Sequence, residues 1–177
     1  LAATGGTGTN ELFNAGEALV KGIEFLTSIN TINLSSKFKL PIYFNYTFTD
    51  AKFSDDFESA FDPWGGDIRS GYYLPYISKH LIGIGAEFKS NSFMVNLDYS
   101  YKSNFRTSPG LEMRNSNDII ESFGVLNTAL NYNFNENVIL KLSVSNLLNK
   151  VYAVASRPAG LRPGQPRVIK LGIKLDL

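Results

Sequence analysis

The chain has 177 residues, a formal net charge of +1, no cysteine and one histidine. Without cysteine there is no disulfide or thiolate metal site, and the lone His80 gives no basis for a histidine-rich metal cluster or a histidine-based triad. The balanced charge supplies no field that would draw nucleic acid, and no run approaches the roughly 18 apolar residues of a membrane helix.

Two strands are predicted in the first fifty residues. The opening stretch 1–16 is rich in glycine and threonine and is predicted to form a loop. A first strand is expected over 17–29 and, after a short polar connection, a second over 37–49. The second segment has the clearest pattern, because an apolar or aromatic residue occupies every second position from Phe38 to Phe48.

Five further strands follow with the same alternation of apolar and polar residues. They are expected around 82–88, 93–102, 126–134, 138–145 and 167–177. The connections that lead into them are in turn long, short, long, short and long, over 50–78, 89–92, 103–122, 135–137 and 146–166.

The alternation of short and long connections indicates the fold class. Transmembrane β-barrels have tight turns at one rim and long loops at the other. The predicted outward faces are almost free of charge and aromatic residues gather near strand ends, as lipid contact requires. A soluble β-sandwich also alternates, but it does not need loops of about twenty residues on one side only. We therefore predict an all-β, transmembrane antiparallel up-and-down β-barrel, of which these strands form an open seven-strand segment with no sheet packed against its inner face.

Two sets of side chains should lie on opposite faces of this sheet. The set expected on the convex, lipid side is Phe44, Leu97, Leu130, Leu142 and Leu171, and the set expected on the concave, lumen side is Asn45, Asp98, Asn131, Lys141 and Lys174. A slip of one residue in register would exchange the two sets. Because such a sheet has two open edges and an apolar face, we expect the isolated chain neither to insert as a working pore nor to stay a soluble monomer.

From residue 146 the sequence is NLLNKVYAVASRPAGLRPGQPR, followed by the last predicted strand. It resembles the C-terminal part of TonB-dependent outer-membrane receptors, where an Asn-Leu-Phe-Asp/Asn-Lys-x-Tyr element ends the penultimate strand. Leu148 and Leu177 stand where the family usually has Phe. The stretch 156–164 is most similar to the ferric-citrate branch of the family. The resemblance extends upstream through VKGIE at 20–24, YTFTDA at 46–51 and LPY at 74–76.

The resemblance implies a place in a larger molecule. Residues 1–177 would form the C-terminal third of a barrel of about 22 strands around a plugged lumen, with the plug domain and the N-terminal strands absent. The implied location is the bacterial outer membrane, and the implied function is uptake of ferric citrate or another ferric siderophore, energised through TonB. A passive porin or structural barrel protein is the alternative, and a soluble binding β-sandwich a further one.

The same resemblance implies a set of partners, and the residues themselves give no sign of catalysis. The partners are the TonB complex acting through the plug, the ferric siderophore, outer-membrane lipid or lipopolysaccharide and the barrel-assembly machinery, with no nucleic acid. We expect no enzyme and no catalytic residue, because no carboxylate is combined with a nucleophile and a base in the sequence. No resident cofactor or metal site is expected either, the ferric chelate being the transported ligand.

Candidate ligand contacts lie in the long loops, which carry binding residues disproportionately. Arginine can pair bidentately with the carboxylates of an anionic chelate, although a structural or merely solvated role stays open for each arginine. The candidates are Trp64, Arg69, Tyr72, Arg106, Arg114, Arg157 and Arg162. The acidic cluster of Asp55, Asp56, Glu58 and Asp62 offers oxygen ligands for Ca²⁺ but lacks the spacing of a calcium loop. The family element implies an architectural role for Asn146, Leu147, Asn149, Tyr152, Arg157, Pro158, Gly160, Arg162, Pro163 and Gly164.

Overall fold

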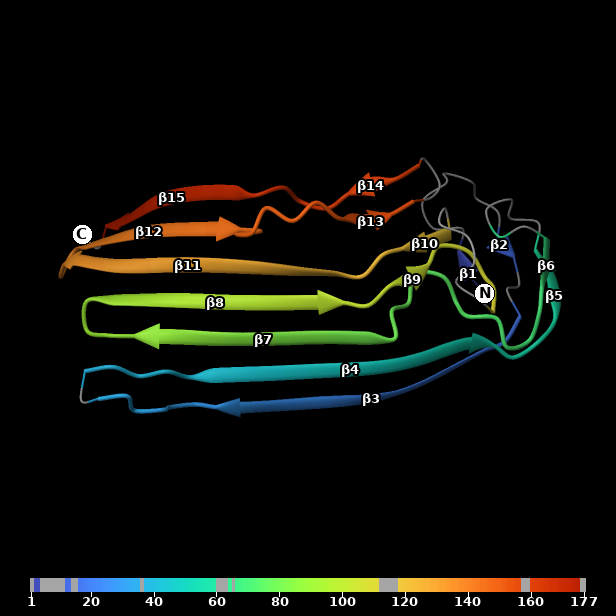
Figure 1. Cartoon of the computed structure of the whole chain (residues 1–177), viewed down its shortest axis with the longest axis horizontal. Coiled ribbons are helices and arrows are strands. Elements are labelled where there is room, and N and C mark those ends of the chain that lie inside the picture. Colours follow the sequence, from blue (N-terminus) through green and yellow to red (C-terminus); the bar gives the residue numbers. More distant parts are fainter. Residues whose placement is uncertain are drawn as a thin grey trace.

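The computed structural model describes residues 2–3, 12–13, 16–35, 37–59, 64, 66–111, 118–156 and 160–175. Its seven long strands are β3 (Ala18–Ile29), β4 (Ile42–Phe53), β7 (His80–Lys89), β8 (Phe93–Lys102), β11 (Phe123–Asn135), β12 (Val138–Ser145) and β15 (Val168–Leu175). They form one antiparallel sheet in the order β15-β12-β11-β8-β7-β4-β3, which is their order along the chain (Figure 1). The predicted up-and-down topology is confirmed.

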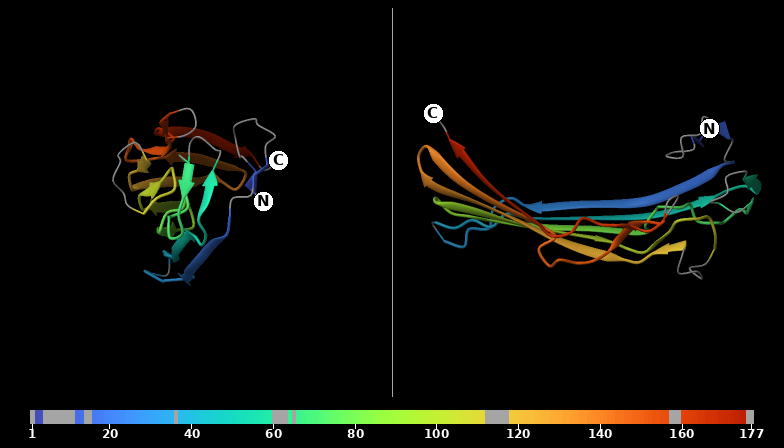
Figure 2. Two further views of the ribbon diagram at one scale, coloured as in Figure 1. Left: turned by 90° about the vertical axis from the view of Figure 1, so that its right-hand side faces the viewer. Right: turned by 90° about the horizontal axis from the view of Figure 1, so that it is seen from above.

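The sheet is curved and open. Seen along its strands it follows an arc (Figure 2), and β3 and β15 are its two edges. The long connections lie together at one end of the sheet, called here the loop end, and the short connections lie at the opposite, turn end (Figure 1). This is the arrangement that the connection lengths predict.

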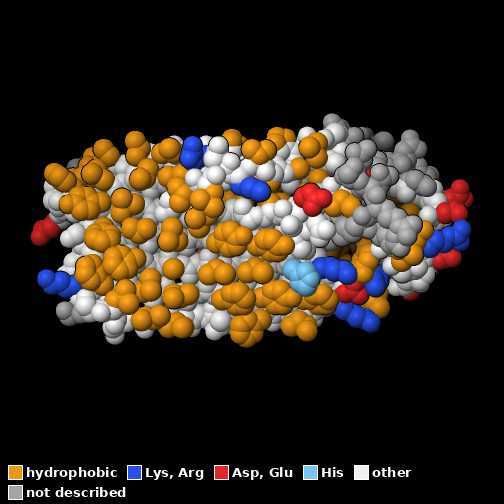
Figure 3. Space-filling model, in the orientation of Figure 1, with side chains coloured by type: hydrophobic (Ala, Val, Ile, Leu, Met, Phe, Trp, Pro, Cys, Tyr) orange, Lys and Arg blue, Asp and Glu red, His pale blue; other side chains and the backbone are white. Residues whose placement is uncertain are grey.

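The register places alternate side chains on opposite faces. Phe44 pairs with Ile84, and Ile84 pairs with Tyr99, so these three side chains share one face. Continuing the register across the sheet puts Leu97, Leu130, Leu142 and Leu171 on that face, and Asn45, Asp98, Asn131, Lys141 and Lys174 on the other. Figure 3 shows that the face turned toward the viewer is rich in hydrophobic side chains, and Figure 2 shows that this face is convex. The predicted facing is confirmed.

Strand β4 begins and ends later than its predicted range of 37–49. Pro41 has no backbone N–H to donate, and Lys39 before it makes only isolated bridges, so regular pairing starts at Ile42. At the other end, residues 50–53 were predicted as loop but remain paired with the start of β3. The outward-facing pattern of β4 therefore continues as far as Lys52.

The opening stretch and the long connections contain short paired ribbons, which corrects the prediction that they are loops throughout. The pairs are β1 (Ala2–Ala3) with β2 (Leu12–Phe13), β5 (Phe57–Ser59) with β6 (Gly66–Ile68), β9 (Phe105–Arg106) with β10 (Ile119–Ile120), and β13 (Ala153–Ala155) with β14 (Arg162–Pro163). Strands of two or three residues are too short to leave a periodic signal in the sequence. The described residues include no helix long and apolar enough to cross a membrane.

Most of the buried apolar residues lie at the loop end. They are Ala51, Phe53, Ile68, Phe105, Ile120 and Ala155, with Val125 and Val144 buried in the sheet itself. By contrast, the convex face stays bare along the strands, where Leu171 is 82% exposed and Leu97 45% exposed. Among the described residues, the loops are packed while the apolar face along the strands remains largely exposed, which is the pattern expected for a surface that faces lipid.

Candidate ligand-binding loops

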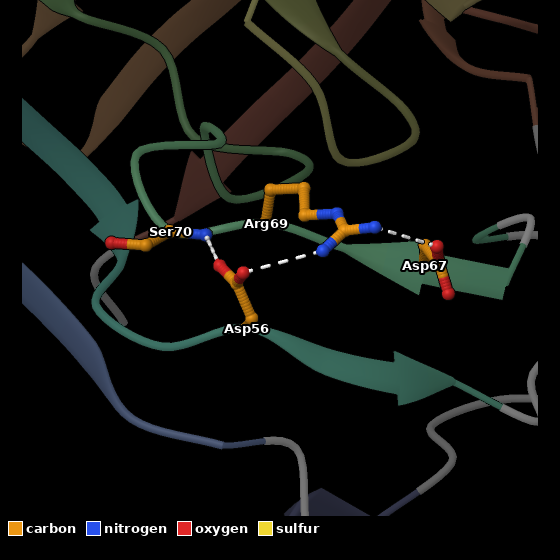
Figure 4. A network of polar contacts seen from close by, with 4 residues as sticks. All are labelled: Asp56, Asp67, Arg69 and Ser70. Carbon is orange, nitrogen blue, oxygen red and sulfur yellow. Dashed lines mark hydrogen bonds and ion pairs between the residues drawn. The ribbon is translucent and has the colours of Figure 1, made fainter.

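The first long loop is held by an arginine that pairs with two carboxylates. Arg69 Nη1 donates to Asp56 Oδ2 at 3.3 Å and Arg69 Nη2 donates to Asp67 Oδ2 at 2.9 Å (Figure 4). The N–H of Ser70 donates to Asp56 Oδ1 at 2.7 Å. The Ser70 N–H and then the Arg69 guanidinium lower the pKa of Asp56, while hydrogen bonding to Asp56 and the charge of Asp67 raise the pKa of Arg69. With 55% of its side chain exposed, Arg69 is fixed in place yet reachable from solvent.

Two aromatic candidates lie close to Arg69. The ring of Trp64 packs edge-on against Phe53 with 5.7 Å between centroids. The backbone of Tyr72 accepts the N–H of Phe53 at 2.9 Å and donates its own N–H to the carbonyl of Arg69 at 3.0 Å. Both aromatic side chains are partly exposed. The structure therefore brings Trp64, Arg69 and Tyr72 together around the end of β4.

Arg106 in the second long loop lies in a different environment. It is only 8% exposed, its Nε donates to the carbonyl of Ser108 at 2.9 Å and its Nη2 donates to the carbonyl of Pro109 at 3.3 Å. Its own carbonyl accepts the N–H of Tyr76 at 2.7 Å. These bonds fix the turn that follows β9, so the guanidinium is directed at backbone carbonyls.

The three long loops of the sheet are joined to one another. Tyr73 of the first loop donates its N–H to the carbonyl of Gly110 in the second at 2.9 Å. Ser156 of the third loop donates its hydroxyl to Thr107 Oγ1 in the second at 3.0 Å. The three loops therefore form one connected layer at the loop end, joined by one backbone and one side-chain hydrogen bond.

Asn146 organises the start of the third loop. It is 1% exposed and has a left-handed backbone, with φ of 50°. Its Nδ2 donates to the carbonyls of Lys150 and Gln165, both at 2.9 Å, and its Oδ1 accepts the N–H of Lys150 at 2.8 Å. Asn149 is also left-handed, with φ of 52°, and its Oδ1 accepts the N–H of Arg167 at 3.4 Å.

The rest of the family element continues this arrangement. The N–H of Leu147 donates to the carbonyl of Leu126 at 2.7 Å. The ring centres of Tyr152 and Phe123 lie 4.4 Å apart. The carbonyl of Tyr152 accepts the N–H of Gly164 at 2.8 Å. A Cβ at Gly164 would overlap the Tyr152 ring, so a larger residue does not fit there.

Arg162 and Pro163 form the short strand β14, where they pair with Ala155 and Ala153, and the Arg162 side chain is exposed. Gly160 just before them has φ of +95°, a conformation that suits glycine. Of the other sequence candidates, Arg114, Arg157 and Pro158 lie outside the described residues.

Two members of the acidic cluster of the first loop, Asp55 and Asp56, make contacts within the protein. Asp55 accepts the N–H of Glu17 at 3.1 Å, and Asp56 is bonded by Arg69 and Ser70. Asp62 lies outside the described residues. Across the part of the chain that the structure describes, no three or more His, Cys, Asp or Glu residues are grouped to hold a metal ion.

One side-chain contact on the concave face was not predicted from the sequence. The hydroxyl of Tyr43 donates to Asp98, reaching from β4 to β8 over Gly85 of the intervening strand β7. A Cβ at Gly85 would overlap the Tyr43 ring. The sequence signal for this contact is the pair of inward glycines, Gly83 and Gly85, in a strand otherwise free of glycine.

Comparison with known proteins identifies the fold. The chain is similar to the siderophore receptor PiuA of Acinetobacter baumannii, with 19% identity and a TM-score of 0.70 over 90% of this chain and 22% of that chain. It is similar to the ferric citrate transporter FecA, with 19% identity and a TM-score of 0.70 over 90% and 24% of the two chains. For the ferric-catecholate import receptor Fiu of E. coli K12 the values are 20% identity and 0.67 over 90% and 21%.

These solved structures are about four times as long as the chain, which spans about a fifth to a quarter of each. None of the curated proteins matches the chain in sequence. A family model does match residues 1–147, and it describes the β-barrel of TonB-dependent receptor-like proteins. The chain therefore belongs to the TonB-dependent receptor-like β-barrel family of the bacterial outer membrane.

Proposed function

We propose that the intact protein containing residues 1–177 takes up a ferric chelate across the outer membrane, energised through TonB. The observation that carries the proposal is the family match over residues 1–147. Three similar structures are described as a siderophore receptor, a ferric citrate transporter and a ferric-catecholate import receptor, which supports a ferric chelate as the ligand. The plug domain and the N-terminal strands of a barrel of about 22 strands belong to this proposal.

The chain would contribute barrel wall and three extracellular loops to that protein. In the loops, the exposed arginines Arg69 and Arg162 would pair with oxygen atoms of an anionic chelate, and Trp64 and Tyr72 would supply apolar contact. Arg114 and Arg157 belong to the same loops and to the same proposed set. Arg106 would act as a positioning residue, because it is buried and bonded to backbone carbonyls.

Uptake by whole cells tests the proposal. Cells without ferric-chelate receptors of their own would carry the intact gene and be supplied with radiolabelled ferric citrate or a radiolabelled ferric catecholate. We expect uptake of at least one chelate that stops when TonB is removed. Uptake that persists without TonB would instead indicate a passive porin, and the absence of uptake of either chelate class would contradict the proposed substrate.

A second comparison tests the proposed contacts. The variant Arg69→Ala/Arg162→Ala should weaken chelate binding by the intact protein at least about tenfold, because each charge-assisted hydrogen bond contributes roughly 1.5–3 kcal/mol. Arg167→Ala is the matched control, since Arg167 is also exposed but lies next to the sheet, before β15. Equal losses in the two variants would show that Arg69 and Arg162 have no specific role.

A further inference from the structure

The concave face carries a basic region in the half nearer the turn end. The lysines that share this face there are Lys39, Lys89, Lys141, Lys170 and Lys174. One row of paired residues runs across the sheet from Lys39 through Lys89 and Lys141 to Gly172. On the convex face, the described residues in the same part of the strands are uncharged. The positive charge is therefore confined to the side that faces the barrel interior.

A hollow of about 480 Å³ lies in this basic region. Its lining includes Lys89, Lys141 and Lys174, together with Asn131 and Asn133. Lys89 and Lys141 are three strand spacings apart, about 14 Å at about 4.8 Å per spacing, because β8 and β11 lie between them. Lys174 lies diagonally across the β12–β15 pair from Lys141. Small-molecule sites commonly measure about 300–1,000 Å³, so the hollow has the size for a small solute rather than for a folded partner.

The region keeps an excess of positive charge after the nearby carboxylates are counted. Glu87 forms an ion pair with Lys89 at the edge of the hollow. Asp98 accepts a hydrogen bond from the β4 tyrosine and lies four residues along β8 from the row of lysines, about 14 Å further toward the loop end. Glu136 lies in the exposed turn between β11 and β12. Among the described residues, no carboxylate of β11, β12 or β15 shares the concave face with Lys141.

We infer that the hollow binds a small solute with several carboxylate groups, as a stage of its passage from the barrel lumen to the periplasm. Ammonium groups and side-chain amides donate the hydrogen bonds that carboxylates accept. The lysines would contact the outer oxygen atoms of a chelate rather than its metal, because a protonated ammonium has no lone pair to offer a metal. The short turns of outer-membrane barrels lie on the periplasmic side, so the hollow is at the opposite end of the sheet from Arg69 and Arg162 (Figure 1).

The exposure of the lysines suits a site that a solute leaves again. Lys141, Lys170 and Lys174 are exposed, and exposed charge pairs are weak and become weaker as salt is added. A solute that moves through a barrel must be held well enough to enter and weakly enough to leave. The ligand class rests on the proposed uptake of a ferric chelate, whereas the place and charge of the hollow follow from the register of the sheet.

A paramagnetic chelate reports on this site in the intact protein in detergent. Ala129→Cys places a label beside the hollow, on the concave face between Asn96 and Ser143, and a trifluoromethyl tag on the cysteine gives one fluorine resonance. Any cysteine outside residues 1–177 is first replaced by serine. Ferric citrate broadens a nearby resonance, and gallium citrate, which has no unpaired electrons, controls for other effects of the ligand. The broadening that iron adds over gallium, followed against concentration, gives the affinity of the site.

Two labelled variants with the same change of charge are compared. The hollow variant is Lys89→Gln/Lys141→Gln/Lys174→Gln, and the matched control, at the loop end, is Lys21→Gln/Lys52→Gln/Lys79→Gln. Because an exposed charge pair contributes about two- to fivefold in affinity, the hollow variant should bind ferric citrate at least about tenfold more weakly. The control variant and a Lys→Arg version of the hollow variant should bind like the unmodified protein. Heat-modifiable mobility in gels confirms folding, and Lys141→Gln/Lys174→Gln replaces the hollow variant if that variant does not fold.

Three results of this titration would overturn the inference. Equal weakening in the hollow and control variants would show a general loss of attraction for anions. Displacement of ferric citrate by acetate at comparable concentration would show a site for any anion. The absence of iron-dependent broadening in the unmodified protein would show that another part of the intact chain fills the hollow.

Uptake by whole cells separates the hollow from the proposed function. The hollow variant should take up ferric citrate at less than about half the rate of the unmodified protein, because the chelate loses a stage of its passage, while surface binding without TonB stays unchanged. If the unmodified protein takes up no chelate but shows the expected broadening, the proposed function fails and the site stands. An unchanged uptake rate in the hollow variant would overturn its role in passage.

Discussion

Asn146 follows the last residue of β12, and its side chain is buried. Asparagine tolerates the left-handed backbone found there better than most residues, and its amide satisfies three backbone groups of the loop that follows. The sequence indicated a structural element here through its resemblance to a family pattern. It could not show that Gln165, nineteen positions away, is a partner, because that contact depends on where the loop returns to the sheet.

The first prediction concerns this side chain. Asn146→Ala should lower the free energy of unfolding of the intact barrel in detergent by about 2–4 kcal/mol, because it removes the three hydrogen bonds that the buried Asn146 amide makes with backbone groups of Lys150 and Gln165. Urea titration followed by intrinsic fluorescence measures the change. Asn91→Ala, at an exposed turn position, removes the same atoms and should change the stability by less than about 0.5 kcal/mol. Similar values for the two variants would show that Asn146 is not structurally central.

A second prediction at this scale concerns pH. Because Ser70 and Arg69 lower the pKa of Asp56 below its ordinary 3.8, the ionised carboxylate stabilises the folded loop above that value, and the stabilisation is lost as the pH falls through the lowered folded-state pKa. Protection of the Ser70 amide from hydrogen exchange, corrected for intrinsic rates, should therefore decrease below about pH 4. Asp56→Asn should remove this pH dependence, whereas Glu58→Gln in the same hairpin should retain it. An unchanged profile in Asp56→Asn would contradict the assignment.

At the scale of the elements, the long strands were predictable and the ribbons were not. A strand such as β8 repeats its alternation over ten residues, so its position follows from the sequence. Ribbons such as β9–β10 pair only two residues on each side, and their stability comes from burial of Phe105 and Ile120 against neighbouring loops. The start of β4 was misplaced because alternation continues through Lys37–Leu40, although Pro41 prevents regular pairing there.

The candidate site was also only partly predictable, because burial and contacts between loops leave no pattern in the sequence. The sequence showed that the long loops carry arginines, but it could not show which of them are exposed. In the structure Arg106 is buried and donates to backbone carbonyls, whereas Arg69 and Arg162 are exposed. The outward positions of Asp50 and Lys52 were not predicted because the second strand was expected to end at Thr49. Extending the period-2 pattern to Phe53 would have placed Asp50 and Lys52 on the convex face.

Glycines in β7 give an element-scale prediction. Gly85→Ala should destabilise the intact barrel by about 1–3 kcal/mol, because the new Cβ would overlap the Tyr43 ring and displace it from Asp98. Gly172→Ala, also on the concave face, brings its Cβ no closer than 3.8 Å to Lys141 and should be neutral or slightly stabilising. Thermal unfolding in detergent compares the two variants. A Gly172→Ala loss as large as that of Gly85→Ala would refute the steric explanation.

The whole sheet has an apolar convex face and two unpaired edges. Each edge presents a row of backbone donors and acceptors that cannot persist in lipid, and the convex face is a large apolar surface in water. The isolated 177-residue chain should therefore aggregate, oligomerise or require detergent, and should form no working pore. Size-exclusion chromatography with light scattering, with and without detergent, measures this. A monodisperse monomer with native sheet content in plain buffer would contradict it.

One face of this sheet should contact membrane lipid while the other faces the barrel interior. Single cysteines can test it, because the chain has none of its own. Spin labels at Leu97, Leu130 and Leu142 and at the adjacent Asp98, Asn131 and Lys141 of the intact protein in outer-membrane vesicles report access to oxygen, which is enriched in lipid. We expect high oxygen access at the three leucine positions and low access at their three neighbours. Reversed values, or equal access at both sets, would contradict it.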